Sequence, residues 1–329
     1  MHSGINVPLC RFIKNKGIKH MWWLYVIIAV VALLAVLTFV VSNMMLNLLV
    51  KPKRADYSSR FEVESTNGNL PQGFFEKNPH EEFRVTSSHG YELYGEFYPN
   101  SVPTNKTFVI VHGHGANIMT SVKYAVMVLK MGYNALMYDN EHCGKSGGEL
   151  EPMGYHERDD LGIMIEKAKE FTGPDAKIYL HGESMGSSSI LMHLKDEKTK
   201  IEAAILDCPF SYLPDEFAFN AKTSFHIPRF PFIPLAGLLC KIKYGFSLSE
   251  VNPLKDIEEN GYEETPMLFI HGKMDTMTPY QMSVRLYEAK KGQKELYLCP
   301  YSEHARTILY ERGEYYRRVS EFLNKSAQA

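Results

Sequence analysis

Positive charge is not in surplus in this 329-residue chain. It has 36 Lys and Arg against 38 Asp and Glu, so the net charge of -2 offers nothing to neutralise a phosphate backbone. The five cysteines include no Cys-x-x-Cys pair, and their odd number argues against a disulfide framework. The thirteen histidines form neither a His-Glu-x-x-His motif nor a paired His/Asp cluster. We therefore expect no nucleic-acid partner, no metal and no cofactor.

Charge is missing altogether from residues 21–41, where Thr38 is the one clearly polar side chain. About 20 apolar residues are needed for a helix to cross the hydrocarbon core of a bilayer, and this segment has that length. Both tryptophans of the chain, Trp22 and Trp23, lie at its start beside Tyr25. Amphipathic rings settle at the headgroup level, so the segment predicts a transmembrane anchor.

A cleaved signal peptide is the main alternative for this segment. Its apolar part would be shorter, and the residues at 42–45 (Ser-Asn-Met-Met) make a poor small-x-small exit. Basic residues flank the segment on both sides, so they barely decide its orientation. The short basic tail at 1–20 favours a cytoplasmic amino terminus, which predicts a single-pass cell-membrane protein with an extracytoplasmic catalytic domain. The flanking basic residues are Arg11, Lys14, Lys16 and Lys19 before it, and Lys51, Lys53 and Arg54 after it.

The rest of the chain has a polar stretch followed by one large folded unit. Residues 42–80 are predicted to be a juxtamembrane linker, and residues 81–325 a single domain. In that domain strand-like runs alternate with helical ones, which predicts a mostly parallel sheet of about eight strands covered on both faces. The expected strands are 83–86, 91–98, 107–111, 135–138, 178–181, 201–206, 267–270 and 295–299, the first two forming a hairpin.

An insertion at 209–262 interrupts this alternation. It is rich in proline and aromatic residues, and its length at a sheet edge is typical of a lid or specificity element. A packing excursion without a gating role is the alternative. The apolar residues of 225–239 either line an acyl pocket or lie against the membrane, and the sequence does not choose between them.

The serine at position 184 stands in a Gly-x-Ser-x-Gly pattern, Gly182 to Gly186. A strand-like run precedes the pattern and a small, then apolar, helical run follows it. Glycines on both sides permit a turn that is too tight for larger side chains, and such a turn lifts the hydroxyl out of the sheet. The pattern therefore predicts a nucleophilic Ser184.

A serine nucleophile needs a base, and the base needs an acid to orient it. Asp275 follows the strand at 267–270, and His304 follows the strand at 295–299. The chain order Ser184, Asp275, His304 is the order expected for this architecture. The alternatives are that Asp275 caps a helix and that His304 is an ordinary surface residue.

Backbone donors are needed for the developing oxyanion. The glycine-rich turn after the strand at 107–111 contains His114, and Met185 follows the serine. We assign the two donors to the N–H groups of His114 and Met185. His112 and His271 occupy matching His-Gly pairs at strand ends, and structural packing is the better interpretation for both.

Together these motifs resemble the α/β-hydrolase superfamily, and within it the serine-aminopeptidase and monoacylglycerol-lipase-like branch, which includes single-pass bacterial surface hydrolases. The resemblance covers about 82–322. It implies an α/β-hydrolase fold with Ser184 as nucleophile, Asp275 as acid, His304 as base, and His114 and Met185 as oxyanion donors. One loop departs from the family pattern Asp-x-Arg-Gly-x-Gly-x-Ser, because Glu141 replaces the arginine and His142 the first glycine. This puts in doubt any role there that depends on positive charge.

The sequence thus predicts a membrane-anchored serine hydrolase that cleaves an ester, thioester or amide of a small or lipid-like substrate through an acyl-enzyme. A peptidase on the same fold is an alternative, in which Asp215 or Glu216 would hold a peptide terminus. An acyltransferase and a non-catalytic binding protein are further alternatives. Acyl specificity and oligomeric state stay open.

Overall fold

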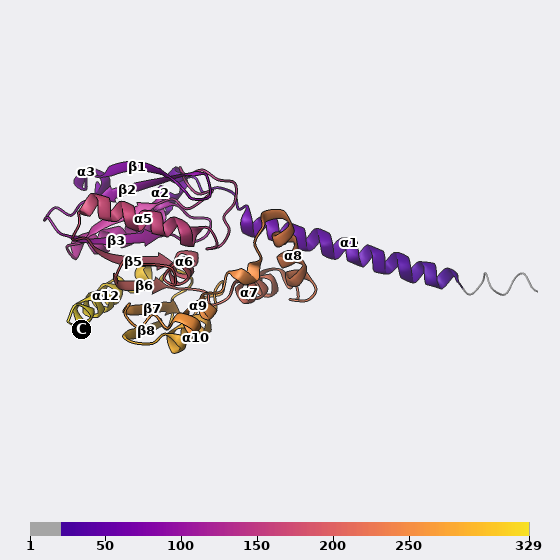
Figure 1. Ribbon diagram of the computed structural model, residues 1–329. Coiled ribbons are helices and arrows are strands. Elements are labelled where there is room, and N and C mark those ends of the chain that lie inside the picture. Colours follow the sequence, from indigo (N-terminus) through magenta and orange to yellow (C-terminus); the bar gives the residue numbers. More distant parts are fainter. Residues whose placement is uncertain (1–20, 329) are drawn as a thin grey trace, which may run out of the picture.

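The computed structural model describes residues 21–328, and its centre is one eight-stranded sheet (Figure 1). The strand order is β1-β2-β4-β3-β5-β6-β7-β8. β1 pairs with β2, and β2 with β4, in antiparallel fashion; the other pairs are parallel. The predicted hairpin and mostly parallel sheet are confirmed. The strands are β1 (Glu81–Thr86), β2 (Glu92–Tyr98), β3 (Lys106–Val111), β4 (Asn134–Tyr138), β5 (Lys177–Glu183), β6 (Ile201–Asp207), β7 (Met267–Gly272) and β8 (Lys294–Cys299).

Helices cover both faces of the sheet, which explains why the central strands are apolar throughout rather than alternating. One face packs against α3 (Phe74–Lys77), α4 (Ile118–Lys130) and α12 (Arg312–Ser326). The other packs against α5 (Glu157–Thr172), α6 (Met185–His193), α9 (Pro253–Asn260) and α10 (Gln281–Ala289). The short α11 (Thr307–Tyr310) precedes α12. This layering is the α/β-hydrolase fold that the sequence predicted.

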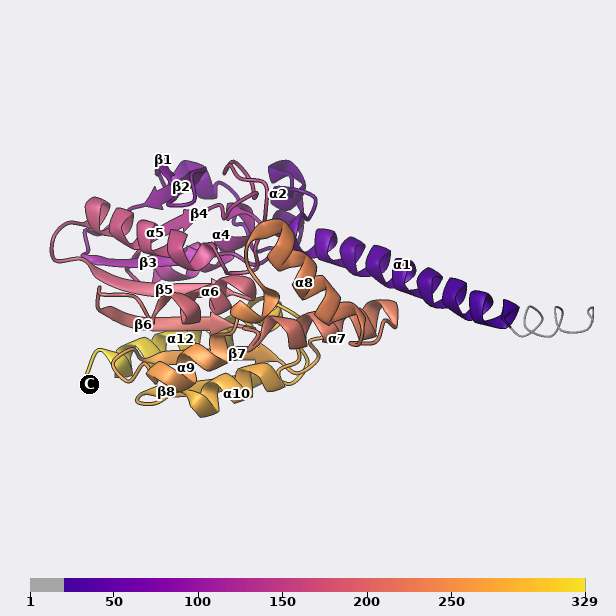
Figure 2. The same ribbon diagram turned by 45° about the vertical axis from the view of Figure 1, so that its right-hand side comes forward.

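The insertion between β6 and β7 contains α7 (Leu213–Phe225), α8 (Phe232–Tyr244), the 3₁₀ helix η1 (Leu248–Glu250) and α9. Only the first part stands away from the sheet (Figure 2). α9 packs against α6 and α10, and its Ile257 is fully buried in the core of that face. The insertion predicted at 209–262 therefore ends in a helix of the fold itself, because α9 is amphipathic and carries an apolar residue to the core.

Helix α1 (Trp22–Val50) is longer than the predicted anchor. Among the described residues it is the one helix long and apolar enough to cross a membrane, with a mean hydropathy of 3.1 over its most apolar window. It extends away from the domain on the side where α7 and α8 lie (Figure 1). Nothing in the segment 42–50 stops a helix, since it contains neither proline, glycine nor charge.

The prediction that residues 42–80 form a linker is corrected by the structure, because most of this stretch is folded against the domain. α1 continues to Val50, α2 spans Tyr57–Thr66, and α3 follows. Leu70 and Phe74 are buried in the core beside α4. Most of the polar residues of this stretch lie on its exposed faces. They outnumber the few buried apolar residues, so the composition alone predicted a linker. The predicted basic tail at 1–20 lies outside the described residues.

Candidate active site

Ser184 sits in a tight turn between β5 and α6. Its φ is +53°, a strained value for a residue with a side chain, and its N–H donates to the Asp207 carbonyl at 2.7 Å. A Cβ on Gly186 would meet the Val111 carbonyl oxygen at 2.2 Å, and one on Gly182 would meet the Ser187 nitrogen at 2.4 Å. The two glycines are therefore required by close backbone contacts, and the turn exposes the hydroxyl at the carboxyl end of β5.

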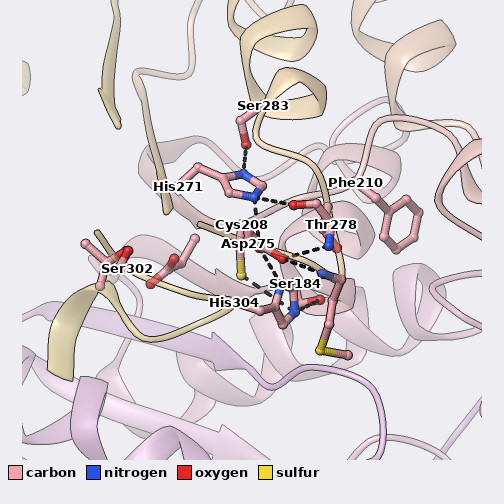
Figure 3. A network of polar contacts seen from close by, with 12 residues as sticks. Ser184, Cys208, Phe210, His271, Asp275, Thr278, Ser283, Ser302 and His304 are labelled. Atoms are coloured by element: carbon pink, nitrogen blue, oxygen red, sulfur yellow. Dashed lines mark hydrogen bonds and ion pairs between the residues drawn. The ribbon is translucent and has the colours of Figure 1, made fainter. Parts of the chain in front are cut away.

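The three residues proposed for catalysis meet at this edge of the sheet (Figure 3). The His304 Nε2 lies 2.9 Å from the Ser184 Oγ, and its Nδ1 lies 2.7 Å from Asp275 Oδ2. Asp275 follows β7 and His304 follows β8, so neighbouring parallel strands deliver both side chains to one place. Because a carboxylate only accepts, Nδ1 carries the proton and Nε2 is free to accept from the serine hydroxyl.

Asp275 is buried and accepts four hydrogen bonds. Its Oδ1 accepts from the N–H groups of Met277 and Thr278, both at 2.8 Å, and its Oδ2 accepts from His304 and from the His271 Nε2 at 3.0 Å. Burial raises the pKa of this carboxyl, but the bonds and charges of the two histidines outweigh it, and the pKa lies well below its usual range. Asp275 is therefore ionised at neutral pH.

His271 is buried, and its role is not packing alone, since it contacts Asp275 directly. Its Nε2 faces the Asp275 Oδ2 and, at 2.8 Å, the Thr278 carbonyl oxygen, which are both acceptors. The Nε2 must therefore carry the proton, and Nδ1 accepts from the Ser283 hydroxyl at 2.6 Å. In the sequence His271 is one half of a strand-end His-Gly pair, and nothing in that pattern indicates a contact with Asp275.

The electrostatics at His304 favour a protonated imidazole more than water does. Burial alone would lower its pKa, but the hydrogen bond and charge of Asp275, with smaller contributions from Glu183 and Glu216, raise it above the ordinary value. A base with this shift holds a proton firmly once it has taken it. The arrangement suits an imidazole that accepts a proton from Ser184 and returns it later.

The two residues predicted as oxyanion donors flank the serine. Met185 is the first residue of α6, so its N–H is one of those that a helix leaves without an internal partner. His114 lies in the turn after β3 and lines the same cavity as Ser184. The His114 side chain turns away, because its Nε2 lies 2.7 Å from the Leu49 carbonyl oxygen.

A buried ion pair lies beneath the serine. Glu183 contacts Lys123 Nζ at 2.6 Å and accepts from the Tyr124 hydroxyl at 2.7 Å. Burial raises the pKa of Glu183, but Lys123 outweighs it and the pKa lies below its usual value. Asp207 accepts from Tyr124 and Tyr315, and burial together with the Glu183 charge raises its pKa to about 6. This network fixes the ends of β5 and β6 that carry the serine turn.

A cavity of about 290 Å³ opens above Ser184. Its lining is mostly apolar and comes from the loops of the sheet, from α7 and from the end of α1. The lining residues are Met45, Leu48, Leu49, Gly113, His114, Met153, Glu183, Ser184, Glu216, Phe217, Asn220, Ala221, Phe225, Met277 and His304. None of the α1 residues was predicted to line this cavity, because the sequence of an apolar helix does not indicate what its last turns contact.

Glu216 and Cys208 lie near Ser184, Asp275 and His304. Glu216, one of the two acids that the sequence offered for a peptide terminus, lines the cavity, while Asp215 pairs on the outside with Arg229 at 2.6 Å. Cys208 lies behind the triad with its Sγ 3.9 Å from His304 Nε2. Cys208, Asp275 and His304 also have ligand atoms close enough to hold a metal, but two of the three are already joined as imidazole and carboxylate.

Comparisons with known proteins identify the family of this chain. The family model described as "Serine aminopeptidase, S33" matches residues 103–238. Uncharacterized protein YqkD of Bacillus subtilis is 34% identical over 266 residues, which are 79% of this chain and 85% of that one. The lysophosphatidylserine lipase ABHD12 of Danio rerio is 22% identical over 73% of this chain and 63% of its own length.

Among solved structures, the Pyrococcus furiosus esterase Pf2001 superposes with a TM-score of 0.64. It is 23% identical, and the match covers 84% of this chain and 99% of the esterase, so it shows a common fold. The extent of the match to YqkD and the match to the family model show the family. This chain belongs to the serine aminopeptidase S33-like branch of the α/β hydrolases and is a serine hydrolase.

Proposed function

We propose that this chain is a membrane-anchored carboxylic ester hydrolase in which Ser184, His304 and Asp275 form the catalytic triad. The single observation that carries the proposal is the unbroken series of hydrogen bonds from Asp275 through His304 to the Ser184 hydroxyl, at 2.7 and 2.9 Å. A serine hydroxyl is a weak nucleophile at neutral pH, and such a series is what activates it.

The reaction follows from the positions of these groups. The Ser184 Oγ attacks the ester carbonyl carbon while His304 Nε2 takes the hydroxyl proton, and the N–H groups of His114 and Met185 hold the oxyanion. The C–O bond to the leaving alcohol then breaks, and His304 returns the proton to that oxygen. Water, deprotonated by His304, attacks the acyl-enzyme and releases the acid. Asp275 keeps the imidazole in one tautomer and stabilises its charge.

The cavity lining supports an ester with an apolar acyl group as the substrate. Met45, Leu48, Phe217 and Phe225 present apolar surface beside Ser184, and pockets of this kind gain affinity mainly from buried apolar area. Two relatives bear names that agree with this class, one a lysophosphatidylserine lipase and the other an esterase.

The membrane anchor is supported by the exposed, uncharged first half of α1. The side chains of Trp22 through Leu37 are all exposed, as they would be against lipid rather than in a protein core. We further propose that the catalytic domain, which follows α1 in the chain, lies outside the cytoplasm.

One labelling experiment tests both the nucleophile and the orientation. Cells with an intact cytoplasmic membrane, expressing the full chain or its Ser184→Ala variant, are treated with a membrane-impermeant fluorophosphonate probe before or after lysis. We expect labelling of the wild type in intact cells and none of the variant, because only the activated hydroxyl attacks phosphorus. Labelling only after lysis would contradict the orientation, and equal labelling of the variant would contradict the role of Ser184.

An aminopeptidase is the second candidate, and Glu216 favours it. Its buried carboxyl lines the cavity that contains Ser184, where it offers a partner to a protonated amine. A p-nitrophenyl ester and an aminoacyl arylamide, assayed side by side, separate the two functions. Faster turnover of the arylamide would make the amide the natural substrate.

A further inference from the structure

The last turns of α1 form one wall of the catalytic cavity. Met45, Leu48 and Leu49 line it together with Ser184 and His304. Leu46 and Val50, on the other side of these turns, are fully buried in a cluster with residues of α7 and α8. The helix that carries the anchor is thus continuous with the active site.

Specific hydrogen bonds hold this end of α1 in place. The last carbonyl groups of a helix have no partner within it, and here the active-site loops supply them. The Leu49 carbonyl lies 2.7 Å from His114 Nε2, and the Val50 carbonyl accepts from the N–H of Glu151 at 2.9 Å. Asn47 accepts from the hydroxyl of Tyr244 in α8 at 3.2 Å. The wall is therefore part of the folded domain and not a tether lying against it.

The length of α1 places this wall next to the bilayer. About 20 residues, at about 1.5 Å each, cross a hydrocarbon core of about 30 Å. α1 has 29 residues, so a crossing that begins at the tryptophans ends near Ser42 and leaves the remaining two turns at the headgroup level. Those turns are the ones that line the cavity.

The rim of the cavity on this side is apolar and open. Leu48 is 59% exposed and Phe225 is 63% exposed although both line the cavity. α8 lies beside the end of α1 in both views (Figures 1 and 2), and its Leu238 and Ile242 are 57% and 71% exposed. Large apolar side chains gathered at one end of a soluble domain mark a surface that meets another apolar phase. Their continuity with the spanning part of α1 identifies that phase as the bilayer.

We propose that the acyl chain of a membrane-resident ester enters the cavity directly from the bilayer, passing between Leu48 of α1 and Phe225 of α7. The substrate is then an amphiphile whose ester group reaches Ser184 while its chain still contacts α1. The proposal rests on the ester-hydrolase function proposed above and adds that α1 selects the substrate as well as anchoring the enzyme.

Acyl-chain selectivity of the full chain in phosphatidylcholine vesicles tests the proposal. The values of kcat/KM are measured for p-nitrophenyl dodecanoate, which partitions into the vesicles, and for the soluble p-nitrophenyl acetate. Leu48→Trp on α1 and Phe225→Trp on α7 each add a larger ring at the proposed entrance, and both positions are exposed enough to accept it. Leu37→Trp makes the same change on the exposed part of α1.

We expect each entrance variant to lower the dodecanoate-to-acetate ratio about tenfold, the effect of losing about two buried methylene contacts, and Leu37→Trp to leave it unchanged. A ratio within threefold of the wild type in both entrance variants would overturn the proposal. A wild type that hydrolyses neither ester and resists the fluorophosphonate probe would instead contradict the ester-hydrolase function.

Discussion

The catalytic cavity has two walls of different construction. On the sheet side, Ser184, Asp275 and His304 stand at the ends of parallel strands and are joined by short hydrogen bonds. The other side, which we propose faces the bilayer and call the membrane side, presents Leu48 of α1 and Phe225 of α7. Both line the cavity and are more than half exposed. The first wall fixes atoms for chemistry and the second offers an adaptable apolar surface. Changes on the sheet side should therefore act on every substrate alike, and changes on the membrane side should act on selectivity and stability.

The largest effect is expected from Asp275→Asn on the sheet side. An amide of the same size keeps the packing but removes the charge that holds His304 in one tautomer. We expect kcat to fall by about 10⁴-fold for both the acetate and the dodecanoate ester, with their ratio unchanged. Steady-state kinetics with the two esters measure both quantities. A clear change in the dodecanoate-to-acetate ratio would break the division between the two walls.

Next in size is Leu46→Ala on the membrane side. Leu46 is fully buried between α1 and the α7–α8 region, so the shorter side chain leaves a cavity. We expect the free energy of unfolding of the domain to fall by about 2–5 kcal/mol, measured by thermal unfolding in detergent. Leu34→Ala is the matched control, because Leu34 is 55% exposed and its loss should change the domain by less than about 0.5 kcal/mol. Equal effects of the two variants would mean that 42–50 is only a tether.

The sheet wall was predictable from sequence, and the membrane wall was not. Strand ends can be located from apolar runs and glycines, and parallel strands bring their carboxyl ends to the same edge. These two rules were sufficient to predict that Ser184, Asp275 and His304 lie close together. The end of α1 has no such signal, because an uncharged apolar helix looks the same whether it contacts lipid or protein. Hydropathy gives the length of a helix but not its neighbours.

The directions of neighbouring side chains on a helix could not be predicted from the sequence either. Asp215 and Glu216 were equal candidates for holding a peptide terminus, yet successive residues on an α-helix point about 100° apart. Glu216 faces the cavity and Asp215 faces Arg229 outside it. Only the packing of α7 against the sheet decides which of the two turns inward.

The smallest expected effect concerns Glu216, with Asp215 as its control, and tests whether a charge on one wall of the cavity acts on the other. Glu216 stands on the membrane-side helix α7, but its charge acts on His304 across the cavity. Burial raises the pKa of Glu216 to about 7, although the positive charges of His304 and His114 oppose the rise. Once ionised, Glu216 stabilises the imidazolium, as do Asp275 and Glu183. Replacing it with glutamine removes one of three negative charges that hold the proton on His304.

We therefore expect Glu216→Gln to lower the pKa of His304 and to move the acid limb of the pH profile of kcat/KM to lower pH by less than one unit.

The pH dependence of the unfolding midpoint tests the same carboxyl independently. A carboxyl whose pKa is raised on folding stabilises the fold fully below its unfolded value of 4.5 and loses that contribution as the pH rises through about 7. The glutamine variant loses nothing there, so its unfolding midpoint relative to wild type should be higher at pH 8 than at pH 4. Asp215→Asn is the matched control, since it changes the neighbouring acid outside the cavity and should leave the acid limb in place. An acid limb that does not move in Glu216→Gln would show that the two walls act independently in charge as well as in shape.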